Sequence, residues 1–390
     1  MAVANNRLLA LDILRGLTIA GMILVNNPGS WKHMYAPFRH AEWNGLTPTD
    51  LVFPFFMFIM GISTYISLQK YDFACHSQVV MKILKRSALI FLIGLSVGWF
   101  SRFCFYWSRE ATDLDFLQRL WQAVWSFDRL RILGVMPRLA LCYGTAAILA
   151  LTVNHRRIPW LIACILGGYF VLLSLGNGFA YDETNLLSIV DRAVLTPAHM
   201  YSDNGIDPEG VLSTLPSVAH VLLGFWVGGL LMNVRKEHPG DLNPLLVRLF
   251  LVGTVLTFTG FLLAYGCPIN KKVWSPTFVL TTCGLGASFL ALLIWLIDVK
   301  GYKRWTRFFE VFGVNPLFMY VLGAVCTILM GSVRFPYEEG SISLQGFVYQ
   351  NILVPLLGDL PGSLAYSVLF LALNWAIGYR LYKRGIYLKI

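Results

Sequence analysis

The chain has 390 residues, of which 56% are hydrophobic and only 13% are charged. A water-soluble domain averages about 25% charged residues, so this composition excludes a soluble globular protein. The net charge of +10 is spread over short loops between apolar runs, without the basic stripe that nucleic-acid binding requires. The seven cysteines form neither a CxxC motif nor a metal-ligand spacing. We therefore expect a membrane protein that binds neither nucleic acid nor metal.

Apolar runs long enough to cross a hydrocarbon layer of about 30 Å recur along the whole chain. They predict an all-α, polytopic integral membrane protein of about ten transmembrane helices, with residues 1–390 forming a single transmembrane domain. The apolar segment 341–358 is short and is predicted to be re-entrant or interfacial. The predicted spans are 8–28, 50–69, 83–106, 131–153, 158–176, 212–233, 247–266, 276–298, 309–331 and 362–382.

The distribution of Lys and Arg predicts the orientation of these helices. Short basic loops, such as KILKR, NHRR and DVKGYKRWTR, alternate with long polar loops. Because basic loops stay on the cytoplasmic side, both termini are expected in the cytoplasm. The loops expected to face outward are 29–49, 107–130, 177–211, 267–275 and 332–361.

Two charged residues lie inside the first predicted span. Asp12 and Arg15 are three residues apart, on one face of the helix. Charged groups in a membrane helix are costly and mark candidate functional sites. Either the two residues form a structural ion pair, or Arg15 binds a phosphate or acidic group that enters from the cytoplasm, because a guanidinium group offers paired donors to such oxygens.

The stretch FRHAEWNGLTPTDLVFP, residues 38–54, concentrates polar residues against the second predicted span. His40 is accompanied by the carboxylates of Glu42 and Asp50 and by the amides of Asn26 and Asn44. Histidine is the usual general base near neutral pH, and a neighbouring carboxylate fixes its tautomer. The alternative is a solvated surface histidine, but the apolar flank argues against free exposure. We interpret this loop as a candidate catalytic site.

The sequence GLSVG, from Gly94 to Gly98, matches the G-x-S-x-G pattern of hydrolase nucleophiles. That pattern requires a strand-to-helix turn, whereas this match lies inside a predicted helix. We interpret the two glycines as a close helix–helix contact.

Two further polar patches precede predicted spans. Asp207 and Glu209 precede the sixth, and Asn270, Lys271 and Trp274 precede the eighth. Each patch could be a simple helix start, with capping side chains beside prolines. Because both are predicted to face the same side as His40, they could also form a polar and aromatic rim for a sugar.

Six motifs together resemble the heparan-alpha-glucosaminide N-acetyltransferase family, including its bacterial NagX-type members, over essentially the whole chain. The motifs are LDILRGLTIAGMILVNNPG, FRHAEWNGLTPTDLVFPFFMFIMG, RILGVMPRLALCY, DPEG, NKKVWSPTF and FGVNPLFMYV. The resemblance implies transfer of acetyl from cytosolic acetyl-CoA to the amine of a glucosamine-type sugar across the membrane. It further implies a homodimer in the bacterial inner membrane, with the active loop facing the periplasm.

The resemblance assigns the active histidine to His40, with Asp50 and Asn26 beside it and no metal. His40 would be either the general base or the acceptor of the acetyl group. The residues expected to bind acetyl-CoA are Arg15, Asn26, Arg131 and Arg138, and those expected to bind the sugar are Glu42, Trp43, Asn44, Asp207, Glu209, Asn270, Lys271 and Trp274.

Two alternative functions remain open at this point. Membrane acyltransferases that O-acetylate surface glycans often have an arginine followed eleven residues later by a histidine, and here Asn26 stands at that distance from Arg15. An amino-sugar transporter would need paired halves with broken helices in matching positions, which the sequence does not show by eye.

Overall fold

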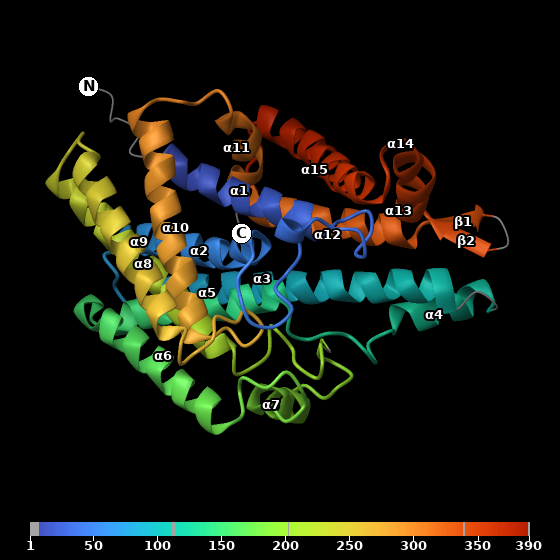
Figure 1. Cartoon of the computed structure of the whole chain (residues 1–390), viewed down its shortest axis with the longest axis horizontal. Helices are drawn as coiled ribbons and strands as arrows, with labels where there is room; N and C mark the ends of the chain where they lie inside the picture. The colour runs from blue at the N-terminus through green and yellow to red at the C-terminus, as the bar shows by residue number, and fades with distance from the viewer. Residues whose placement is uncertain (1–7, 111–113, 202, 338–339, 389–390) are drawn as a thin grey trace.

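The computed structural model describes residues 8–110, 114–201, 203–337 and 340–388, and helices dominate these ranges (Figure 1). The sheet in the described part of the chain consists of two antiparallel strands that form a hairpin. The helices and strands are α1 (Leu9–Val25), α2 (Val52–Gln69), α3 (Ser77–Phe105), α4 (Phe116–Val124), α5 (Val135–Thr152), α6 (Ile158–Leu175), α7 (Leu186–Val194), α8 (Thr214–Glu237), α9 (Asn243–Leu263), α10 (Pro276–Leu293), α11 (Thr306–Val314), α12 (Pro316–Ser332), β1 (Arg334–Tyr337), β2 (Gly340–Ser343), α13 (Leu344–Phe347), α14 (Val354–Leu357) and α15 (Asp359–Lys383).

The predicted class, an all-α polytopic membrane protein, is confirmed. Among the described residues, eight helices are long and apolar enough to cross a membrane, or nine if the bent pair α11–α12 is one span. Helix α1 has 17 residues, slightly fewer than the roughly 20 that cross a bilayer. Every predicted span overlaps a helix, but the number ten stays a prediction. The apolar helical segment Leu344–Leu357 is shorter than a span, as expected.

The ninth predicted span is not one straight helix. Helices α11 and α12 meet at an angle of 89°. Pro316 opens α12, and Asn315 has a non-helical backbone (φ −126°, ψ 55°). Proline is tolerated at the start of a helix but interrupts a continuous one, so the bend falls directly before it.

The β1–β2 hairpin follows α12 where the sequence predicts a loop. Arg334 pairs with Ser343 and Tyr337 with Gly340. Figure 1 shows the hairpin beside α13, at the same end of the molecule as α4. The hairpin departs from the prediction but leaves the fold class unchanged.

Small residues allow the central helices to pack closely. A Cβ atom at Gly61 of α2 would lie 2.1 Å from the Val221 carbonyl oxygen of α8, and one at Gly224 would lie 2.2 Å from that of Phe58. Larger residues would separate the two helices, which is why small residues gather at membrane helix contacts. Gly94 allows a similarly close contact between α3 and α5, since a Cβ atom at Gly94 would lie 2.6 Å from Cδ of Pro137. The GLSVG motif thus lies within a packed helix and makes no nucleophile turn.

Three loops meet at one end of this helix bundle: 26–51, 176–213 and 264–275. The Gly45 amide donates to the Ile269 carbonyl oxygen at 2.8 Å. The Trp43 indole donates to the Phe179 carbonyl oxygen at 3.0 Å. These contacts bring together polar patches that are far apart in the sequence.

Candidate active site

Asp50 lies on the one-turn helix Pro48–Leu51 that leads into α2. Its carboxylate accepts hydrogen bonds from the backbone amide and hydroxyl of Thr47, at 3.2 and 2.9 Å, and from the Ala41 amide at 3.0 Å. Thr47 and Asp50 form a capping box, an arrangement that satisfies donors at a helix start. Asp50 is only 1% exposed, so the loop holds a buried carboxylate in one orientation.

His40 contacts this carboxylate directly. Its Nδ1 lies 2.6 Å from Asp50 Oδ1, and 42% of its side chain is exposed. A carboxylate accepts hydrogen bonds, so it favours the tautomer with the proton on Nδ1. The lone pair of the imidazole is then on Nε2, which is the arrangement required of a general base or a nucleophile.

Lys271 completes the group from the loop between α9 and α10. Its Nζ lies 3.2 Å from Asp50 Oδ1 and 3.1 Å from His40 Nδ1. The ammonium group balances the charge of the buried carboxylate, so the imidazole lies beside a compensated ion pair. Lys271 therefore lies directly against His40 and Asp50, and its role in sugar binding stays a prediction.

An aromatic pair stands near this group. The rings of Trp43 and Tyr181 are stacked, with centroids 4.5 Å apart and an interplanar angle of 20°. Asn44 is exposed and accepts a hydrogen bond from Asn270 at 3.1 Å. Glu42 is also exposed. Stacked rings, an amide and a carboxylate are suited to the faces and hydroxyls of a sugar.

A cavity of about 390 Å³ is lined by Arg15 and lies between α1, α2, α3, α5 and α12. The guanidinium group of Arg15 donates to Ser63 Oγ at 2.7 Å and pairs with Asp12 at 3.1 Å. Arg86 lines the same cavity and lies over the Tyr143 ring at 4.8 Å. The structure thus shows the Asp12–Arg15 pair and also an arginine at a cavity wall, so both interpretations of Arg15 stand.

A second cavity, of about 310 Å³, continues along α1 towards Asn26. Met22 and Tyr320 line both cavities, so the two cavities are adjacent. Arg15 and Asn26 are eleven residues apart, or about 16 Å along a helix at 1.5 Å per residue. Asn26 is exposed at the end of α1 and lines this second cavity with Ser101. Asn26 therefore lies at the wall of the cavity along α1, and its role beside His40 stays a prediction.

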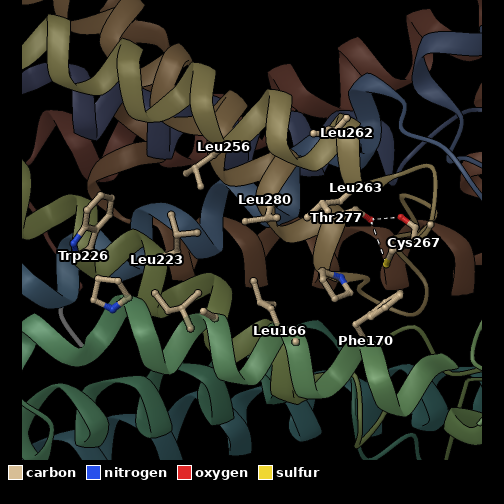
Figure 2. Close-up of a pocket in the computed structure, with 16 residues that line it drawn as sticks. Leu166, Phe170, Leu223, Trp226, Leu256, Leu262, Leu263, Cys267, Thr277 and Leu280 are labelled. Carbon is tan, nitrogen blue, oxygen red and sulfur yellow. Dashed lines mark hydrogen bonds between the residues drawn. The ribbon is translucent and has the colours of Figure 1, made fainter. Parts of the chain in front are cut away.

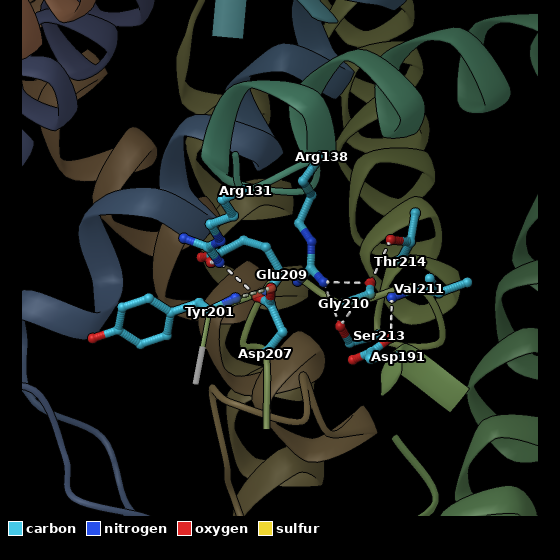
Figure 3. A network of polar contacts seen from close by, with 10 residues as sticks. All are labelled: Arg131, Arg138, Asp191, Tyr201, Asp207, Glu209, Gly210, Val211, Ser213 and Thr214. Atoms are coloured by element: carbon cyan, nitrogen blue, oxygen red, sulfur yellow. Dashed lines mark hydrogen bonds and ion pairs between the residues drawn. The ribbon is translucent and has the colours of Figure 1, made fainter. Parts of the chain in front are cut away.

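A second polar cluster lies between α5 and the loop that precedes α8 (Figure 3). Arg131 pairs with both Asp207 and Glu209. Burial alone would raise the pKa of Glu209, but the Arg131 guanidinium lowers it below its usual value. The contacts of Asp207 are internal: its carboxylate also accepts from the Tyr201 and Glu209 amides. Asp207 is fully buried, so it holds this loop instead of facing a sugar.

Three further predicted binding residues are buried in the structure. Arg138 is fully buried and donates to the Gly210 carbonyl oxygen at 3.1 Å and to the Ser213 hydroxyl, so acetyl-CoA could not reach it in this structure. Trp274 is 1% exposed and packs edge-on against Phe278, which removes it from any outer rim. Asn270 is also fully buried, and its side-chain amide donates a hydrogen bond to the exposed Asn44.

Several residues of the site were missed in the sequence. Thr47 was predictable, because a Thr three residues before an acidic residue signals a capping box. Tyr181 and Arg86 carried no local signal, since their partners come from other loops and helices. In the described part of the chain, no group of three or more His, Cys, Asp or Glu residues could hold a metal ion.

The chain is similar to known proteins of one family. Residues 7–265 match the family described as "Heparan-alpha-glucosaminide N-acetyltransferase, catalytic". The mouse (Mus musculus) heparan-alpha-glucosaminide N-acetyltransferase is 28% identical over 375 residues, covering 81% of this chain and 53% of the mouse protein. The human (Homo sapiens) protein of that name is 28% identical over 377 residues, covering 81% and 52%. The chain thus spans about half the length of these curated relatives. It belongs to the heparan-alpha-glucosaminide N-acetyltransferase catalytic family.

Proposed function

We propose that the chain transfers acetyl from acetyl-CoA to the amine of a glucosamine-type sugar across the membrane. The observation that carries this proposal is the contact between a half-exposed His40 and a buried Asp50, at 2.6 Å. A sugar amine is mostly protonated at neutral pH, so the reaction needs a base beside the acceptor. The relatives' names include both an acetyl transfer and a glucosaminide, which fits this chemistry.

The two neighbouring cavities along α1 support a donor path. Arg15 and Arg86 would bind the phosphates of acetyl-CoA, because guanidinium groups match phosphate oxygens. The pantetheine arm would extend past Met22 and Tyr320 towards Asn26. Volumes of about 390 and 310 Å³ are within the range of about 300–1,000 Å³ for small-molecule sites.

Direct transfer would proceed in one step at His40. The amine attacks the thioester carbonyl carbon while Nε2 takes the proton from the amine. The C–S bond then breaks, and the imidazolium returns the proton to the departing CoA sulfur, which gives an acetamide and a free thiol. The Asn26 amide would donate to the oxyanion, and one such donor contributes about 3 kcal/mol.

A two-step route uses the same residues. Nε2 of His40 attacks the thioester carbonyl carbon, the C–S bond breaks, and CoA leaves as the thiolate. The amine then attacks the acetylated imidazole, the bond from the acetyl carbon to Nε2 breaks, and the proton that the amine loses ends on the CoA thiolate. Direct transfer is the simpler route, since a single histidine suffices for it. In both routes, Asp50 orients the imidazole and stabilises its positive charge.

The basic loops support an orientation. The positive-inside rule puts the Arg15 end of α1 at the cytoplasm and the His40 loop in the periplasm of a bacterial inner membrane. Both termini would then be cytoplasmic. A homodimer remains a prediction of the family resemblance.

Purified protein in detergent tests the reaction class. We expect acetyl-CoA to acetylate glucosamine on nitrogen, with free CoA released in equal amount. N-Acetylglucosamine is the matched control, because it keeps the hydroxyls but lacks a free amine. Ester formation on N-acetylglucosamine would instead indicate an O-acyltransferase. If no CoA is released with either acceptor, the proposal is contradicted.

A further inference from the structure

A third cavity lies away from the residues discussed so far (Figure 2). It is an apolar groove of about 660 Å³ between α6, α8, α9 and α10. Leu166 and Phe170 of α6 face Leu262 of α9 across it, and Leu223 of α8 and Leu280 of α10 contribute to its lining (Figure 2). All four helices are candidate membrane spans, so the groove lies at the level of the lipid hydrocarbon.

The groove suits a hydrocarbon chain. Thr277 supplies a hydroxyl to the lining, but this hydroxyl already lies 2.8 Å from the Cys267 carbonyl oxygen, its acceptor. A ligand with hydrogen-bonding groups would therefore lose its water contacts on entering and regain few of them. A lipid tail has no such groups to lose.

One end of the groove is lined by the loop that carries Lys271. Gly266 and Cys267 line the groove, and the same loop continues to Lys271, which contacts His40 and Asp50. Cys267 and Lys271 are four residues apart, so their Cα atoms are at most about 15 Å apart. The loop is anchored to the His40 loop by the hydrogen bond between Gly45 and Ile269. The two sites are thus joined by a short, anchored segment.

We propose that the acceptor is an amino sugar attached to a lipid, with the lipid tail in this groove and the sugar at His40. This inference rests on the proposed function and names the class of its acceptor. The bilayer is as apolar as the groove, so the tail gains little from leaving it. The benefit is confinement: a tail held in the groove raises the effective concentration of the amine at His40.

Two adjacent glycines allow a matched test. Gly167 lines the groove, and a Cβ atom there would have no heavy atom within 4 Å. Gly168 is exposed and equally open, but it is not among the groove-lining residues. Gly167→Phe therefore fills the groove, whereas Gly168→Phe adds the same side chain outside it. Replacing a helical glycine carries no backbone penalty in either variant.

The experiment compares two acceptors in proteoliposomes, methyl β-glucosaminide and dodecyl β-glucosaminide. The readout is the ratio of kcat/KM for the dodecyl acceptor to that for the methyl acceptor, which cancels general effects on the enzyme. We expect Gly167→Phe to lower this ratio about tenfold, because the added ring occupies space that the lipid tail would fill. Gly168→Phe should keep the wild-type ratio. Equal ratios in all three proteins, or an equal fall in both variants, would overturn the inference.

A second readout does not depend on turnover. A dodecyl glucosaminide with a diazirine in its tail should cross-link to α6, α9 or α10 in wild type, and much less in Gly167→Phe. If wild type fails to acetylate methyl β-glucosaminide, the proposed function is wrong, and this cross-link still reports on lipid binding in the groove. Cross-links spread evenly over all membrane helices would overturn the groove as a site.

Discussion

Two polar clusters of similar composition lie near the same end of the helices, and they differ in exposure. The His40–Asp50–Lys271 cluster combines a buried carboxylate with an imidazole whose side chain is 42% exposed. In the second cluster, Arg138 and Asp207 are fully buried. The Arg131 side chain is 31% exposed, but its guanidinium group is paired with Asp207 and Glu209. Composition alone would rank the second cluster higher, because it has more charged groups.

The two clusters therefore differ in whether a substrate could reach a functional atom, which the proposed role of His40 requires. In the second cluster the charged groups hold one another and the backbone around Gly210, which fixes the start of α8. Its role is to position the loops. In the first cluster, the same kind of buried carboxylate orients a side chain that faces outward. The predictions below separate these two roles.

The largest effect is expected from His40→Ala. Loss of general base catalysis should lower kcat for glucosamine acetylation by about 10²- to 10⁴-fold, while acetyl-CoA still binds. His33→Ala is the matched control, because His33 lies in the same loop and its side chain is 43% exposed, but it pairs with Asp359. Steady-state kinetics and acetyl-CoA binding of both variants give the answer. Equal losses in both would make His40 an ordinary loop residue.

Asp50→Asn should cause a smaller loss. It removes the charge that orients His40, and hydrogen bonds to charged groups contribute about 1.5–3 kcal/mol, so kcat should fall about 10- to 100-fold. Thr47→Val is the control, since it removes a hydrogen bond to Asp50 but leaves the contact with His40. If Thr47→Val lowers kcat as much as Asp50→Asn, then Asp50 maintains the loop and has no orienting role.

Arg15→Ala should act on the donor. We expect about a tenfold higher KM for acetyl-CoA, with little change in KM for glucosamine, because a charge-assisted contact is lost. Asp12→Asn removes the ion pair but keeps the guanidinium group, so it should change KM for acetyl-CoA much less. Similar kinetics of the two variants would support the structural ion pair instead.

The smallest effect concerns stability in the buried cluster. Burial raises the pKa of Asp191 to about 6, from an ordinary value of 3.8, against the opposing hydrogen bond from the Val211 amide. The folded protein therefore holds this proton more tightly than the unfolded chain, so this group's stabilising contribution is complete below about pH 4 and is lost as pH rises to about 6.

Asp191→Asn should remove this contribution to the pH dependence. Thermal unfolding of the detergent-solubilised protein between pH 4 and 6 should show a less negative slope in the variant, and kcat at pH 7 should stay near wild type. Unchanged slopes would show that Asp191 has an ordinary pKa. A large fall in kcat would mean that the second cluster takes part in the reaction.

The fold was largely predictable because membrane spans are encoded locally, in the length of each apolar run. The His40–Asp50 contact was predictable for a similar reason, since the two residues are ten apart in one motif. The contact of Lys271 with Asp50 joins residues 221 apart, and no local pattern encodes it. Trp274 was expected at the surface, but its loop turns inward with a left-handed backbone (φ 53°) and buries the ring.

The most direct test of the account uses sealed proteoliposomes with acetyl-CoA enclosed and glucosamine outside. N-Acetylglucosamine should appear in the outer medium with wild-type protein and not with His40→Ala. Product that forms only when both reagents are on the same side of the membrane would contradict transfer along the cavities from Arg15 to the His40 loop.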